Sequence, residues 1–374
     1  MFDPFKRARV RAAKKIRRSV ASTVTDTWGN LLGPAKSVKR TKSKTEKKAN
    51  TSSVTTRNRK SGAAPVKSKT PATSRSRSTV PRGASFQSGT HDCAFGTRTF
   101  KLYLPVVAGK NSGPLPLVVM LHGCGQTPQD FARGTGMNTL AEEFGFIVLY
   151  PAQARKAHLN RCWNWFRRGD QMRGAGEPAL IASLTRTVIA EHNVDPARVY
   201  VAGLSAGAAA AMIVATAYPD IFAAVGVHSG MAAGAAHDAG SATRAMQGGD
   251  PGKRQEIPTP TIIFHGDADK VVNPRNGRFV TMRAVEPFAA LSKNEQTRSG
   301  ANGRGYTRIQ YRIGKGRPYV EQWVVHEAGH AWSGGHVAGS YTDPKGPDAS
   351  REMVRFFMRH RTTKKRRATL PQTG

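Results

Sequence analysis

Serine, aspartate and histidine side chains occur along the chain in an order that suits covalent catalysis. Ser205 stands in the pentapeptide "GLSAG", between an apolar run and an alanine-rich run. Asp267 and Asp269 follow in "TIIFHGDADKVVNP", and His326 and His330 follow in "VVHEAGHAW". A serine hydroxyl is a weak nucleophile at neutral pH, so it needs a basic partner and a group that orients that partner. The sequence therefore predicts nucleophilic attack by Ser205 on a carbonyl carbon.

The pentapeptide lies between a predicted strand, "RVYVAGLS", and a predicted helix, "AGAAAAMIVATAYPDIF". Glycines at 203 and 207 permit the sharp turn from strand to helix that exposes the serine hydroxyl, as in the nucleophile elbow of α/β-hydrolases. In that class the acid and then the histidine follow the serine, each after a later strand. Asp267 and Asp269 are both candidates for the acid. The alternative is that these groups are turn aspartates and surface histidines.

The histidines also match H-E-x-x-H, the spacing by which two histidines on one helix face bind zinc. That spacing requires a helix, whereas "EQWVV" favours a strand and Gly329 interrupts a helical turn. A zinc site of His326, His330 and His336 remains an alternative. His330, in a glycine-containing loop, is better placed as the base for Ser205, and His326 is expected to be structural inside the strand.

A negatively charged oxygen in the transition state needs two hydrogen-bond donors. The helix start after Ser205 supplies the amide of Ala206. The loop "LHGCGQTP", residues 121–128, follows an earlier buried strand, where such enzymes place the second donor. We predict that the amides of Cys124 and Ala206 form this oxyanion hole.

Strand and helix patterns alternate from about residue 96 onward. Apolar runs such as "PLVVMLHG", "FIVLYPA", "AAVGVHSG" and "TPTIIFHGDAD" predict buried parallel strands. Residues 129–145 and "PALIASLTRTVIAEHN" predict helices, with further helices near Phe279–Phe288 and Ser350–Arg359. This alternation predicts an α/β fold with a mostly parallel, doubly wound sheet, whose ligands sit at the carboxyl ends of the strands.

Positive charge is concentrated at the two ends of the 374-residue chain, whose net charge is +34. Residues 1–90 contain 23 Lys and Arg and three acids, and six more basic residues follow from Arg359, so the middle keeps about +8. We expect a largely disordered basic extension at 1–90, a catalytic domain at 91–360 and a basic tail at 361–374.

Apolar residues at every fourth position indicate a basic amphipathic helix within residues 5–32. Such a helix suits an anionic membrane, a polymer granule or nucleic-acid phosphates, although no specific nucleic-acid motif is present. A solvated charge run is the alternative. We expect no transmembrane segment and no secretory signal, which favours a cytoplasmic or granule-associated location.

Six ordered blocks over roughly residues 90–358 resemble the poly(3-hydroxybutyrate) depolymerase family of esterases, relatives of feruloyl and acetylxylan esterases. They are "LHGCGQ", "CWNWF", "GLSAGAAAA", "YPDIFAAVGVHSG", "HGDADKVVNPRNG" and "GHAWSGG". The resemblance implies an α/β-hydrolase fold and hydrolysis of carboxylic esters without a metal or organic cofactor. It also implies a triad of Ser205, Asp269 and His330, with Asp269 favoured over Asp267 by its place before "KVV".

The resemblance further implies an oxyanion-binding amide at Cys124, a bridge between Cys124 and Cys162, and substrate contacts by Trp163 and Trp332. Such a bridge suits an extracellular or periplasmic location, in conflict with the missing signal peptide. The implied substrates are short-chain hydroxyalkanoate polyesters or oligomers. Since only about 40 residues follow His330, we expect no separate polymer-binding module.

Two alternative functions stay open. One is a feruloyl or acetylxylan type of carbohydrate esterase. The other is a weakly catalytic protein that acts through its basic tails on nucleic acid, membranes or granule surfaces.

Overall fold

The computed structural model describes residues 80–109, 113–299 and 303–364. Nearly all of the expected basic extension, including the predicted amphipathic helix, and most of the basic tail lie outside the described residues. The first strand begins at Ser85, so it crosses the expected domain boundary at residue 90. Among the described residues, no helix is both long and apolar enough to pass through a bilayer.

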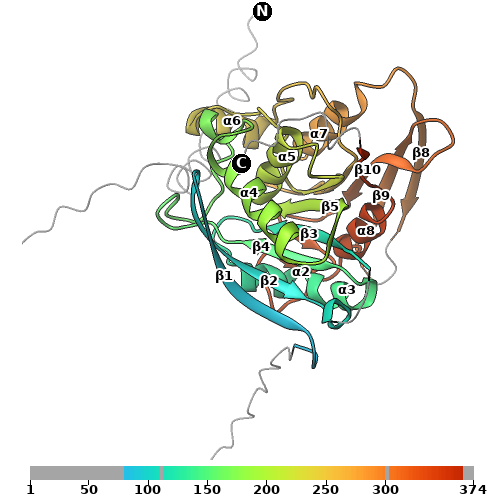
Figure 1. The fold of residues 1–374 in the computed structure, drawn as a ribbon. Coiled ribbons are helices and arrows are strands. Elements are labelled where there is room, and N and C mark those ends of the chain that lie inside the picture. The colour runs from blue at the N-terminus through green and yellow to red at the C-terminus, as the bar shows by residue number, and fades with distance from the viewer. Residues whose placement is uncertain (1–79, 110–112, 300–302, 365–374) are drawn as a thin grey trace, which may run out of the picture. The chain divides into compact units, whose positions relative to one another are not determined.

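One large sheet dominates the described part of the chain (Figure 1), in the order β1-β2-β4-β3-β5-β6-β7-β10-β9-β8. Its strands are β1 (Ser85–Cys93), β2 (Gly96–Leu104), β3 (Leu115–Leu121), β4 (Ile147–Pro151), β5 (Val194–Leu204), β6 (Ala224–His228), β7 (Thr261–Gly266), β8 (Ser292–Arg298), β9 (Tyr306–Arg312) and β10 (Pro318–Val325). The six central strands, from β4 to β10, are parallel, and the strands at both edges are antiparallel. The predicted fold class, a mostly parallel α/β sheet, is confirmed.

Helices cover both faces of this sheet. They are α2 (Pro128–Thr135), α3 (Met137–Phe144), α4 (Gly176–Glu191), α5 (Ala206–Ala217), α6 (Ala239–Gly248), α7 (Arg275–Val285) and α8 (Ala349–Phe357). Two short 3-10 helices, η1 (Val106–Gly109) and η2 (Arg168–Asp170), and a small pair of strands, β11 (Trp332–Ser333) and β12 (Thr342–Asp343), complete the described structure.

Alternation along β3 explains why both faces are covered. Leu117, Val119 and Leu121 pack in one buried cluster, together with apolar side chains of α4, α5 and α7. Val118 and Met120 point to the opposite face and pack with α2, α3 and α8. When the side chains on both faces of a strand are apolar, both faces must be buried. The continuous run "LVVML" predicts such a strand.

The structure differs from the predicted elements in a few places. The single helix expected at 129–145 is two helices, α2 and α3, because Gly136 adopts φ 63° between them and ends the first. β10 ends at Val325, so His326 lies beyond the strand and not inside it. The β8–β9 hairpin and α6 were not predicted, since their polar sequences lack a strong apolar period.

Candidate active site

Ser205 occupies the turn between β5 and α5, with the left-handed backbone angles φ 58° and ψ −121°. Positive φ is strained for a residue with a Cβ, so the surroundings must hold it there. Its amide donates to the backbone oxygen of His228 at 2.9 Å, which ties the turn to the end of β6. A Cβ at Gly207 would overlap the backbone oxygens of Leu121 and His122, so only glycine lets α5 start this close to β3.

Asp269 and His330 lie together at the same edge of the sheet. Asp269 follows β7, and its Oδ2 accepts a hydrogen bond from His330 Nδ1 at 2.8 Å. Its Oδ1 accepts from the amides of Val271 and Val272, both at 2.9 Å. The Asp269 side chain is fully buried and that of His330 is 10% exposed. The carboxylate therefore fixes both the orientation and the tautomer of the His330 ring.

The environment of Asp269 keeps it ionised. Burial alone raises the pKa of this carboxyl group, but hydrogen bonds from His265 and His330 outweigh burial and hold the pKa well below its usual range. His265 Nε2 lies 3.4 Å from Asp269 Oδ2 and also contacts the backbone oxygen of Val272 at 2.9 Å. Asp269 thus stays charged and able to stabilise a protonated His330.

The other candidate groups have different partners. Asp267 Oδ1 accepts the amide hydrogen of Glu327 at 2.6 Å, so it fastens the loop that carries His330. His326 Nε2 lies 3.0 Å from Thr307 Oγ1 on β9, and His336 Nδ1 accepts from the amide of Ala338 at 3.1 Å. Across the described ranges, no group of three or more His, Cys, Asp or Glu side chains is placed to hold a metal ion.

The amides of Cys124 and Ala206 are the predicted donors to the oxyanion. The first N–H groups of a helix have no partner within the helix, and Ala206 is the first residue of α5. Cys124 lies in the loop after β3, where Gly123 donates its amide to Gln126 Oε1 at 2.9 Å and Gly125 donates to Asn160 O at 2.7 Å. No hydrogen bond between described residues uses the amide of either Cys124 or Ala206. Both donors are therefore available to a ligand.

A disulfide joins Cys124 to Cys162, the pairing that the family resemblance implies. It connects the loop after β3 to the segment after β4, next to the Gly125–Asn160 hydrogen bond. Cys93 is a free cysteine. The cross-link therefore restrains the backbone on both sides of the Cys124 amide.

The two tryptophans expected to contact substrate are buried instead. Trp163 is 0% exposed and donates its Nε1–H to the backbone oxygen of His122 at 3.0 Å. Trp332 is 1% exposed, donates to Ser350 Oγ at 3.0 Å and stacks on the His228 ring at a centroid distance of 4.9 Å. Their position corrects the expectation, because an indole enclosed by protein cannot form a wall that substrate reaches. Both support the site from behind.

Sequence reasoning did not identify the role of His228 and His265, which stand at the ends of β6 and β7. His228 Nε2 accepts from the amide of Ser333 at 2.9 Å, and burial lowers the pKa of His228 to about 3. The ring is therefore neutral and acts as an acceptor. The available signal was position, since both histidines end apolar runs that lead to the catalytic edge of the sheet.

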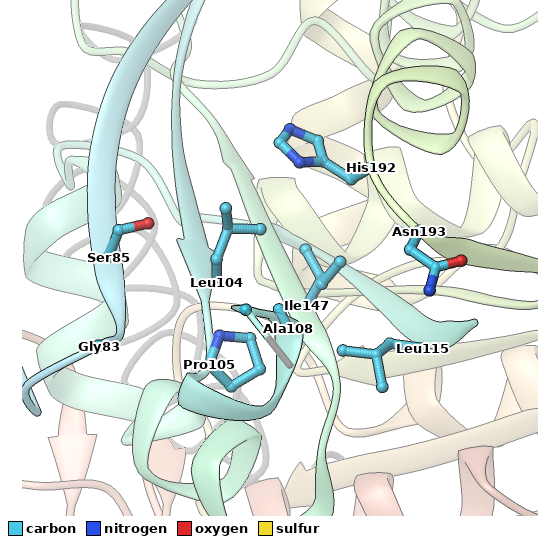
Figure 2. Close-up of a pocket in the computed structure, with 10 residues that line it drawn as sticks. Gly83, Ser85, Leu104, Pro105, Ala108, Leu115, Ile147, His192 and Asn193 are labelled. Atoms are coloured by element: carbon cyan, nitrogen blue, oxygen red, sulfur yellow. The ribbon is translucent and has the colours of Figure 1, made fainter. Parts of the chain in front are cut away.

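One cavity lies far from these groups (Figure 2). It has a volume of about 170 Å³ and its wall is mostly apolar, with Leu104, Pro105, Leu115 and Ile147 at its centre. Leu115 begins β3, whereas the Cys124 loop follows its other end, a strand length of roughly 20 Å away. This cavity therefore lies at the amino ends of the strands, opposite the Ser205 edge.

Comparisons with known proteins identify a family and several relatives of this chain. Residues 98–300 match the family model described as esterase PHB depolymerase. Poly(3-hydroxyalkanoate) depolymerase C of Paucimonas lemoignei is 34% identical over 230 residues, which cover 58% of this chain and 54% of that protein. Feruloyl esterase B of Neurospora crassa is 30% identical over 268 residues, 64% of this chain and 82% of the relative.

The chain thus spans about half the length of the depolymerase and most of the feruloyl esterase. A solved structure, the acetyl xylan esterase from Aspergillus awamori, is 20% identical with a TM-score of 0.57, covering 73% of this chain and 99% of that one. At this identity the likeness concerns the fold alone. Because the family model spans more than half of the sequence, the chain belongs to the PHB depolymerase family of esterases.

Proposed function

We propose that the protein is a serine esterase that hydrolyses carboxylic esters through Ser205, His330 and Asp269. The observation that carries the proposal is the strained turn at Ser205, on the same edge of the sheet as the buried Asp269–His330 pair. A positive φ at a non-glycine residue needs a compensating reason, and exposing a nucleophile at a helix start is such a reason.

The mechanism follows from the chemistry of these groups. His330 Nε2 takes the proton of Ser205 Oγ as the oxygen attacks the ester carbonyl, and the carbonyl oxygen becomes negative. The amides of Cys124 and Ala206 donate to that oxygen. The alkoxide leaves with the proton from His330, and the acyl group stays on Ser205. Water then attacks the acyl-enzyme by the same route and releases the acid.

Within the described residues, His330 is hydrogen-bonded to Asp269 but not to Ser205 Oγ. Catalytic hydrogen bonds are often long without substrate and tighten in the Michaelis complex, so this geometry is compatible with the proposed proton transfer.

The proposed substrates are short-chain hydroxyalkanoate oligomers or polyesters. The depolymerase of P. lemoignei supports this choice by its name, and the feruloyl and acetylxylan esterases support acylated carbohydrates as the second candidate. Both classes contain the same reacting group, a carboxylic ester. They differ in the groups that surround it.

The test is hydrolysis of a short-chain chromogenic ester by the purified protein and by Ser205→Ala. We expect the variant to lower kcat at least about a thousandfold, because the nucleophile is lost while the oxyanion donors remain. Ser292→Ala, an exposed position on the edge strand β8, is the matched control and should keep full activity. Equal rates in the parent and in Ser205→Ala would refute the mechanism. A comparison of kcat/KM for hydroxybutyrate oligomers and acetylated xylo-oligosaccharides then selects the substrate class.

A further inference from the structure

A second concave site lies beside the loop that carries Cys124. It is a groove of about 680 Å³, formed by the β1–β2 hairpin, the segment after β4 and the start of α2. We call it the cationic groove, because Lys101, Arg155 and Arg161 line it and none of its lining residues is an Asp or Glu.

The three cations differ from several arginines elsewhere in the described residues that are paired with carboxylates. Arg98, Arg173 and Arg355 each have a carboxylate partner. In the part of the chain that the structure describes, the printed ion pairs include none with Lys101, Arg155 or Arg161. Three like charges around one hollow repel each other, and an anionic ligand relieves this repulsion.

The groove also has hydrogen-bonding groups beside its cations. Ser88 and Thr90 of β1 pair with Lys101 and Thr99 of β2, so these four side chains share one face of the hairpin. The side chains of Ser88, Thr90 and Thr99 line the same hollow. Hydroxyl donors beside the cations suit a carboxylate, which accepts hydrogen bonds from both kinds of group.

His122 connects the groove to the candidate active site. Its side chain lines the groove, and its backbone oxygen contacts the start of α5 so closely that Gly207 must be glycine. Burial, together with the nearby charge of Arg161, lowers the pKa of His122 to about 4, so the ring is neutral. The positive charge of the groove therefore comes from its three basic side chains and not from His122.

Topology sets the distance between the groove and the nucleophile. The segment Ala152–Arg155 follows β4, the Cys124 loop follows β3 and Ser205 follows β5, and these three strands are neighbours in the sheet. β4 lies two strand spacings from β5 and β2, which carries Lys101, lies three, which amounts to about 10 to 15 Å. A substrate with its ester at Ser205 can thus extend over the Cys124 loop into the groove, on the side away from β7 and β10.

We propose that the cationic groove binds a carboxylate carried by the substrate, about 10 to 15 Å from the ester that is cleaved. The inference rests on the proposed esterase function and adds a selectivity to it. Two kinds of ester supply such a group: a hydroxyacid oligomer ends in a free carboxylate, and an acylated sugar chain can carry a uronic acid.

The test measures binding without turnover. In the Ser205→Ala background, calorimetry compares the linear trimer of 3-hydroxybutyrate as free acid with its methyl ester, and an acylated xylo-oligosaccharide with and without a glucuronic acid. We expect about tenfold tighter binding for the acidic member of one pair at low salt, since each exposed cation contributes severalfold or less. In 1 M salt the preference should vanish, because the Debye length falls to about 3 Å. The pair that shows the preference identifies the source of the carboxylate.

Variants of the groove test whether the preference for the acidic ligand depends on its cations. Adding Lys101→Gln and Arg155→Gln should reduce the preference for the acid to about twofold or less, with the fold checked by thermal unfolding. Arg244→Gln, an exposed cation on α6 outside the groove, removes charge elsewhere and should leave the preference unchanged. Equal affinity for acid and neutral ligand in both pairs, no binding of either acid, or a preference that survives the double variant overturns the proposal. Because no step needs hydrolysis, the outcome is independent of the Ser205→Ala activity test.

Discussion

Replacing Asp269 by asparagine separates the role of its charge from the role of its shape. Asp269 Oδ1 accepts two amides at 2.9 Å, from Val271 and Val272. In Asp269→Asn the amide oxygen keeps these two bonds, so the NH2 group takes the place of Oδ2, 2.8 Å from His330 Nδ1. An NH2 group donates, so Nδ1 must become the acceptor and the ring proton must move to Nε2. The nitrogen that has to take the Ser205 proton is then already protonated.

We therefore expect kcat of Asp269→Asn to fall about 10³- to 10⁴-fold, which corresponds to roughly 4 to 5.5 kcal/mol in the activation barrier. The pKa of Asp269 lies well below its usual range, so the parent carboxylate is ionised throughout the neutral range and a change of pH within it should not restore the variant. KM should change little, because neither oxygen of Asp269 faces an open surface.

Asp267→Asn is the matched control, two residues away. Its Oδ1 accepts only the Glu327 amide, and asparagine can keep that bond. We expect kcat within about threefold of the parent, because most surface substitutions change free energies by about 0.5 kcal/mol or less. Steady-state kinetics on a chromogenic ester measure both variants, and thermal unfolding checks that each is folded. The reasoning is wrong if Asp269→Asn keeps more than a tenth of kcat, or if both variants lose activity equally.

Three further predictions concern stability. Gly207→Ala should lower the unfolding free energy by about 3 kcal/mol, since its Cβ would overlap two backbone oxygens after β3, and denaturant titration checks this. Replacing Cys124 and Cys162 by serine removes a cross-link between positions 38 apart, and the chain-entropy model predicts that the unfolding free energy falls by about 4 kcal/mol. A melting temperature that the double change leaves unaffected would contradict this prediction. Burial lowers the pKa of His228 from 6.5 to about 3, so the unfolded chain binds its proton first and stability is lost as pH falls through this window. His228→Asn should therefore reduce the pH slope of the unfolding free energy, measured by denaturant titration at several pH values, by up to about 1.4 kcal/mol per unit.

The fold was predictable because its central strands are apolar on both faces. The run "LVVML" became β3 with all of its residues buried, and the same pattern identified β4, β6 and β7. Strands that are apolar on both faces must be covered by helices on both sides, and this requirement leaves few alternative folds. The edge hairpin β8–β9 carries no such signal, since every residue of β8 is exposed. The position of this hairpin depends on its pairing with β10, and no local sequence pattern specifies that pairing.

The candidate site was predictable to a different extent. Turn geometry depends on local residues, so "GLSAG" placed between a predicted strand and a predicted helix was sufficient to predict the turn at Ser205. Burial of an aromatic side chain depends on distant segments. Trp332 lies between Phe131 of α2 and His228 of β6, and those contacts are distant in the sequence. For this reason the family resemblance, which implied a substrate contact by Trp332, did not reveal that this side chain is enclosed.

Strand order explains why a neutral histidine lies on the strand between those that lead to Ser205 and to Asp269. β6 lies between β5 and β7, so His228 separates Ser205 from Asp269, while His330 follows β10 one strand further on. The backbone oxygen of His228 holds the Ser205 amide and its Nε2 accepts the Ser333 amide. A protonated ring here would repel the imidazolium that His330 becomes during proton transfer. Burial prevents that protonation, so His228 supports the turn from within the sheet without opposing the charge on which the proposed catalysis depends.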